Sequence, residues 1–219
     1  MGGSLDPGRG HFELSTLNIE LPHISPFLPV TLVVIAGIVA PGCGLFDTRD
    51  PESPSESNCF SIPQTRPGIV IANLQTAVAQ KCVDNYAGCF SGGTAGQRLL
   101  DFVPSAEARD QYAAVLNGWT AADEQAYFRN LIARGVVNGF AGVQLAARDS
   151  VISPDSVVYS YDYIFTFEHS EPGFPITARG NMQVSLAPDA NNIWRIYRWV
   201  DLKTTDDVTW SLFKGVFGN

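Results

Sequence analysis

Three aspartates of this 219-residue chain come nearest to residues that could carry acid–base chemistry. Asp101, Asp162 and Asp201 each lie in or next to an apolar run that is expected to form a strand. Such a carboxylate could act as a general base if donors for a developing oxyanion lay close to it. No second acid or histidine accompanies them at a recognisable spacing, and His169 is expected on the surface at a strand end. Asp101 and Asp162 are therefore kept as catalytic candidates, Asp201 is interpreted as a structural hydrogen-bond acceptor, and a domain without catalysis is favoured.

A stripe of aromatic residues could instead line a ligand site. Tyr159, Tyr161, Tyr163 and Phe165 alternate along one expected strand and therefore share one face of it. Together with Trp194 they would suit a small apolar ligand that also needs a few hydroxyl contacts. Aromatic residues on a long strand more often fill the core, so core packing is the favoured interpretation of this stripe.

The four cysteines do not form a metal site. No pair has the spacing of a zinc-binding motif, and no histidine lies near them, so no metal is expected. If Cys43 is lipidated, Cys59, Cys82 and Cys89 can form at most one disulfide. Cys82 and Cys89 are seven residues apart, roughly 10 Å along one helix, so they could pair only if that helix broke. Buried thiols are favoured for these two, and the pairing is left open.

Composition and charge exclude several classes of function. The chain is 45% hydrophobic, 16% charged and carries a formal net charge of −8, which suits neither a disordered chain nor a nucleic-acid-binding protein. It has no phosphate-binding loop, no nucleophile elbow and no zinc-protease motif, and no cofactor is expected.

The first 66 residues are interpreted as an export leader and a tether. Residues 28–40 form an uncharged apolar run that is too short to cross a bilayer as a helix. The adjoining Ala40-Pro41-Gly42-Cys43 resembles the lipobox of bacterial lipoproteins, which implies cleavage after residue 42 and lipidation of Cys43. Residues 43–66 are then a lipidated cysteine and a disordered tether rich in Pro, Ser, Asp and Glu. A buried or uncleaved apolar segment is the alternative.

Helical patterns dominate the first half of the remaining chain, residues 67–219. Apolar spacing predicts a helix from Pro67 to Lys81 and a shorter one over residues 83–90. Ser105 can cap a helix that begins at Ala106. The clearest helix covers residues 121–133, with Thr120 before it and Gly135 after it.

Strand patterns dominate the second half and are expected to finish the domain. Period-two alternation predicts strands over 156–169 and 176–186, and further strands over 138–152 and 193–202. A short strand is also expected over residues 99–103. Helices followed by a strand meander indicate an α+β domain with its helices packed on one face of an antiparallel sheet.

This element order resembles the nuclear-transport-factor-2-like (NTF2-like) superfamily, a curved α+β cone. The residues that carry the likeness are Trp194-x-Ile196-x-x-Trp199-x-Asp201 and the later Thr209-Trp210-Ser211. The resemblance implies a cavity between the sheet and the helices. It also implies two further alternatives, a ketosteroid-isomerase- or polyketide-cyclase-like enzyme and a homodimeric scaffolding module.

The favoured hypothesis is a lipoprotein anchored in the bacterial cell envelope through Cys43, in the outer membrane facing the periplasm. Its α+β domain is expected to bind a small apolar ligand or an envelope protein, and no nucleic acid.

Overall fold

The computed structural model describes residues 59–93 and 98–218. The expected leader, Cys43 and the tether up to residue 58 lie outside the described residues. Within the described ranges, no helix combines the length and apolar character that crossing a bilayer demands. The helices are α1 (Pro67–Gln80), α2 (Val83–Ala87), α3 (Ala106–Gln111), α4 (Ala113–Leu116), α5 (Ala121–Ala133) and α6 (Trp210–Phe217). The strands are β1 (Asp101–Val103), β2 (Ala141–Ile152), β3 (Val157–Phe167), β4 (Thr177–Pro188) and β5 (Trp194–Leu202).

The start of α5 follows the local chemistry expected from the sequence. The backbone N–H of Asp123 donates to the Thr120 hydroxyl at 3.3 Å, and the N–H of Thr120 donates to the Asp123 carboxylate at 2.8 Å. This reciprocal capping box satisfies two backbone donors at the start of the helix. The cap expected at Ser105 is wrong, because its side chain makes no bond to the start of α3 and its hydroxyl instead pairs with Thr209 at 2.8 Å.

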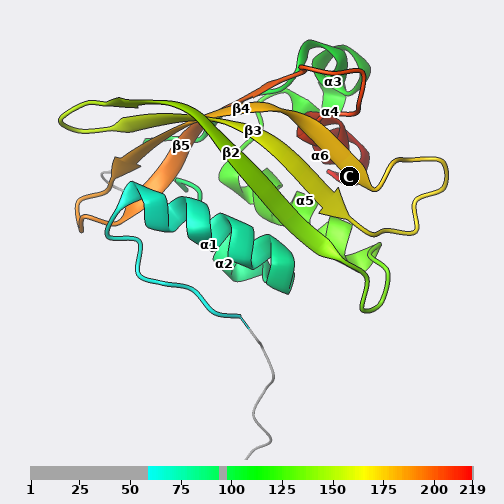
Figure 1. The fold of residues 1–219 in the computed structure, drawn as a ribbon, viewed down its shortest axis with the longest axis horizontal. Coiled ribbons are helices and arrows are strands. Elements are labelled where there is room, and N and C mark those ends of the chain that lie inside the picture. The colour runs from blue at the N-terminus through cyan, green and yellow to red at the C-terminus, as the bar shows by residue number, and fades with distance from the viewer. Residues whose placement is uncertain (1–58, 94–97, 219) are drawn as a thin grey trace, which may run out of the picture. The chain divides into compact units, whose positions relative to one another are not determined.

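The sheet has the order β1-β5-β4-β3-β2, and the four long strands β2 to β5 are antiparallel neighbours, as expected. β1 departs from the prediction because it pairs in parallel with β5, so the whole sheet is mixed. A parallel pair needs a long crossover connection, and α3 to α5 with β2 to β4 supply it. Register shifts at Ala147/Asp149 and Ser185/Leu186 bend the strands (Figure 1). The α+β class, with helices packed on a curved sheet, is confirmed.

Alternation along β3 decides which residues enter the core. Tyr163, Phe165 and Phe167 are buried, whereas Tyr159 and Tyr161 on the same face are only half-buried. Val157, at the start of the strand next to the β2–β3 hairpin, is again buried. The predicted face of β3 is therefore correct, but its burial is interrupted at Tyr159 and Tyr161.

The sequence did not indicate α6, and the expectation that strands finish the domain is wrong. This helix packs against the buried face of β3, with the Trp210 ring stacked on Phe165 at 4.3 Å and Phe213 edge-on to Phe165 at 5.0 Å. Seven of its eight residues are buried. With eight residues the helix is shorter than the window over which helical periodicity is recognised in a sequence.

Two further residues differ from the expectation. The buried free thiol favoured for Cys82 is wrong, because Cys82 forms a disulfide with Cys59 that fixes the segment ahead of α1 to the end of that helix, while Cys89 is a free buried thiol as favoured. His169 is also buried, packed between Phe213 and Phe217, so its assignment to the surface is wrong. The loop that follows β3 folds back onto α6 and encloses it.

Candidate functional site

The two catalytic candidates lie at the surface on different strands. Asp101, on β1, is exposed and ion-paired with Arg198. Asp162, on β3, is ion-paired with Arg148 and accepts a hydrogen bond from Asn181 at 3.0 Å. These hydrogen bonds, that from Arg148 first, hold the pKa of Asp162 below its ordinary value. The structure therefore does not bring the two carboxylates together in one site.

The five candidate ligand-binding aromatics are also divided. Tyr163 and Phe165 are core residues beneath α6. The rings of Tyr159 and Tyr161, with centroids 5.8 Å apart, line a surface depression of about 370 Å³ near the β2–β3 hairpin. Partial burial raises the pKa of Tyr161. Trp194 is half-buried at the start of β5, and its backbone N–H donates to the Gln64 carbonyl at 2.8 Å.

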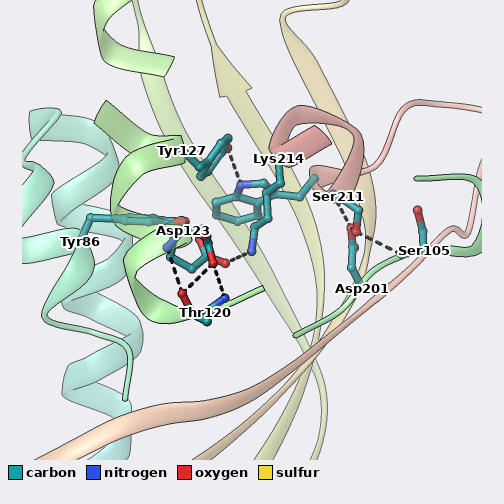
Figure 2. Close-up of polar contacts among 10 residues, drawn as sticks. Tyr86, Ser105, Thr120, Asp123, Tyr127, Asp201, Ser211 and Lys214 are labelled. Atoms are coloured by element: carbon teal, nitrogen blue, oxygen red, sulfur yellow. Dashed lines mark hydrogen bonds and ion pairs between the residues drawn. The ribbon is translucent and has the colours of Figure 1, made fainter. Parts of the chain in front are cut away.

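A buried ion pair that the sequence did not reveal lies between α5 and α6. The Lys214 ammonium donates to the Glu124 carboxylate, and both side chains are 0% exposed. Glu124 also accepts a hydrogen bond from the Tyr86 hydroxyl at 3.0 Å. The ammonium lies 3.9 Å from the ring centroid of Phe102 and 3.8 Å from that of Trp199, where the negative ring faces attract it. Figure 2 shows Lys214 between Tyr86 and Tyr127 on one side and Asp201 on the other.

A second buried acid, Asp201, is held by three donors from its surroundings. The backbone N–H of Ser211 donates to it at 2.7 Å, the Ser211 hydroxyl donates to the same oxygen, and the Tyr163 hydroxyl donates to the other oxygen at 2.8 Å. Tyr163 in turn accepts the backbone N–H of Trp210 at 2.8 Å. The interpretation of Asp201 as a structural acceptor agrees with these contacts, although Arg198 is not among its donors.

Burial shifts the pKa values of this cluster against charge. Loss of water lowers the pKa of Lys214, and the nearby Glu124 carboxylate offsets part of that effect. Burial raises the pKa of Asp201 and raises the pKa values of Tyr86 and Tyr163 well above their ordinary range, so both phenols stay protonated as donors. All five side chains are at most 2% exposed, so the cluster is closed to a substrate in this conformation.

An accessible site lies next to Phe102, whose ring also contacts Lys214 of the buried cluster. Two depressions, of about 500 and 370 Å³, share the residues Phe102 and Gly118 and together form what we call the Phe102 groove. β1 forms one wall, and the turn between α4 and α5 forms the other. Gly118 adopts a φ of +71° in this turn, a conformation that glycine takes at little cost. The groove is lined by residues 91–92, 99–104, 109, 113 and 116–122.

One wall residue, Trp119, has an unsatisfied donor. Its side chain is only 5% exposed, and its indole N–H finds no acceptor among the described residues. Buried donors normally have a partner, so this N–H is a local cost to stability, but the nitrogen is not accessible from the groove in this conformation. Asp101 is the one carboxylate along these walls, and Arg198 already holds it.

Comparisons with known proteins place the chain by its fold alone. No protein-family model and no curated protein sequence matches it. Among solved structures, an NTF2-like superfamily protein from Salmonella enterica has 13% identity and a TM-score of 0.46, covering 64% of this chain and 89% of that one. An NTF2-like protein from Cytophaga hutchinsonii has 12% identity and a TM-score of 0.43, covering 62% and 93%. A conserved protein from Planctomyces limnophilus has 10% identity and a TM-score of 0.46, covering 61% and 89%. At these values the likeness concerns the general arrangement of helices and sheet and transfers no site residue.

The sequence contained one usable sign of the buried cluster. Lys214 is the only charged residue in the run Trp210–Phe217, and a lone cation in an apolar segment requires a partner if that segment is buried. Glu124 gave no such sign, because an acid in the first turn of α5 is also what a solvent-exposed helix start favours.

Proposed function

We propose that this domain is a small-ligand-binding module whose site is the Phe102 groove, held at the bacterial cell envelope by a lipid on Cys43. The observation that carries the binding proposal is the contrast between a filled interior and an open groove. Tyr163, Phe165 and Lys214 occupy the interior with their own side chains, whereas the groove offers open volume between largely apolar walls. Its two parts have volumes within the range of small-molecule sites.

The disulfide supports the envelope part of this proposal independently of the leader. Cys59 and Cys82 are joined with their Cα atoms 5.6 Å apart, and such bonds persist in exported proteins far more than in the cytosol. In a lipoprotein that begins at Cys43, the bond would tie the tether to the end of α1.

Native mass spectrometry of the protein extracted from its own host's membranes tests both parts. We expect the native spectrum to contain a small-molecule adduct that disappears on denaturation. The variant Ala113→Trp places a bulky side chain at the exposed edge of the groove and should abolish the adduct. Ala114→Trp adds the same side chain at the adjacent exposed position, which does not line the groove, and should keep it.

The denatured mass decides the anchor separately. A mass that begins at Cys43 and carries acyl chains supports the lipoprotein proposal, whereas a mass that retains residues 1–42 without lipid contradicts it. An adduct that is equally abundant in both tryptophan variants would show that the ligand binds elsewhere, and the groove would lose its assignment.

A further inference from the structure

The chemistry of the smaller part of the groove points to one ligand class, an amphipathic carboxylate. In this assignment, which rests on the proposed function, the apolar body lies on Phe102 and Leu116 and the carboxylate pairs with Arg109. Three properties of the site support it: an unpaired cation at one end, apolar walls, and no free cation at the other end among the described residues.

Arg109 differs from most other cations of the domain. Of the lysine and arginine side chains that the structure describes, most form ion pairs, such as Arg198 with Asp101 and Lys203 with Glu107. The exposed Arg109 side chain has no acidic group within 4.0 Å and no hydrogen-bond acceptor in the described part of the chain. A guanidinium presents two parallel N–H groups that match a carboxylate, so Arg109 is ready to bind one without first breaking another pair.

The surroundings of Arg109 are suited to an apolar body. The depression of about 370 Å³ is walled by Phe102, Val103, Pro104, Ala113 and Leu116, with Asn117 and Arg109 as its polar residues. Phe102 and Leu116 are at least 90% buried, so they give the floor a fixed shape. Burying an aliphatic or aromatic ligand against such a floor is favourable by the hydrophobic effect.

The other half of the groove gives the ligand a direction. Asp101 lies there, paired with Arg198, and no lysine or arginine lines that half in the described residues. Because Arg198 neutralises Asp101, this half offers a ligand carboxylate no free cation among its described residues, whereas Arg109 offers one at the other end. The apolar body therefore extends from Arg109 across Phe102 toward Leu99 and Leu100, which line the far part.

Isothermal titration of the full chain with three ten-carbon probes below their micelle concentrations tests this assignment. The probes are decanoate, decanol and decyltrimethylammonium, which share an apolar body and differ in charge. We expect decanoate to bind about tenfold more tightly than decanol, and decyltrimethylammonium to bind more weakly than both, because a hydrogen bond to a charged group adds about that factor.

The variants separate the charge from the apolar contact. Arg109→Gln should lower decanoate affinity about tenfold, to the level of decanol, and Arg109→Lys should retain part of the preference. Arg129→Gln removes the same charge from an exposed residue of α5 outside the groove and should change nothing. Since Arg109 is exposed, these variants are expected to fold, and their unfolding transitions confirm it.

The outcomes also distinguish this inference from the proposed function. Equal affinity for decanoate and decanol, or a preference that survives Arg109→Gln, overturns the carboxylate assignment. If decanol binding is still lost in Ala113→Trp, the groove remains a ligand site. Failure of all three probes overturns the carboxylate assignment, and a host-derived adduct that Ala113→Trp removes would still support the groove. Without such an adduct, both proposals fail.

Discussion

Removing the Lys214 ammonium while keeping the bulk of its side chain is the sharpest test of the buried cluster. Lys214→Met leaves the Glu124 carboxylate in a site where both side chains are 0% exposed. The remaining acid keeps the hydrogen bond from Tyr86 at 3.0 Å but loses its only cationic partner among the described residues. A buried charge without a counter-charge is strongly unfavourable, because neither water nor a cation replaces the lost interaction.

The expected loss follows from the complete burial of the pair. Breaking a buried ion pair by removing one partner costs about 3–5 kcal/mol of the free energy of unfolding. For a domain of this size each kcal/mol corresponds to roughly 2–4 °C in Tm, so Lys214→Met should lower Tm by about 10 °C. Glu124→Gln should also destabilise, because it leaves the Lys214 ammonium without its carboxylate while Asp201 compensates only in part.

Urea unfolding of the wild type, both single variants and the double variant measures the coupling. The double variant contains no unpaired charge at this position and keeps an acceptor for Tyr86, so it should be about 2 kcal/mol more stable than the sum of the single losses predicts. The slope of the unfolding free energy with urea should stay constant across the series. Additive losses, or a loss below about 1 kcal/mol for Lys214→Met, would refute the interpretation of this contact as a coupled, dehydrated ion pair.

Three further predictions concern the cysteines and the second buried acid. Cys59→Ser should lower the free energy of unfolding by about 3 kcal/mol, the chain-entropy value for a disulfide that spans 23 residues. The Tm of the variant should no longer respond to reductant. A Tm equal to that of the wild type would argue against the bond to Cys82. Burial raises the pKa of the Cys89 thiol to about 12, so iodoacetamide at pH 8 should modify it only after unfolding, and fast labelling of the native protein, detected by mass, would contradict its burial. Burial also raises the pKa of Asp201, so the native state binds more protons than the unfolded state above pH 3.8. Protonation of Asp201 therefore stabilises the native state, and this stabilisation is lost as pH rises through the native pKa. The stability advantage of the wild type over Asp201→Asn should therefore grow between pH 7 and pH 4 in urea unfolding, and a constant difference would disprove the raised pKa.

Local signals in the sequence were sufficient for most elements. The capping residue Thr120 and the periodic apolar residues placed α5 at its observed bounds, and the period-two alternation of Tyr163, Phe165 and Phe167 identified the buried face of β3. These features depend on neighbours close in the chain, so they can be read from one sequence. The parallel pairing of β1 with β5 joins residues almost a hundred positions apart, and local patterns do not encode it.

The candidate site was harder to predict because its parts come from distant segments. Lys214 and Glu124 are ninety residues apart, so the lone cation in its apolar run did not identify its partner, and Glu124 has a common explanation as a surface residue. The groove is formed by β1 and the turn around Gly118, neither of which showed a motif. The aromatic stripe was visible, but α6 covers Tyr163 and Phe165, and α6 is too short for its periodicity to be recognised in the sequence.

The buried cluster and the groove are parts of one construction, although one is closed and the other open. Ser211 and Lys214 lie one turn apart on α6 and attach that helix to Asp201 of β5 and to Glu124 of α5. An apolar helix can pack in several nearby registers at similar cost, whereas hydrogen bonds and an ion pair at two points favour a single one. Because the Lys214 ammonium lies 3.9 Å from the Phe102 ring, the register of α6 also sets the height of the groove floor. The polar residues that no ligand reaches therefore help to determine the shape of the surface that we assign to binding.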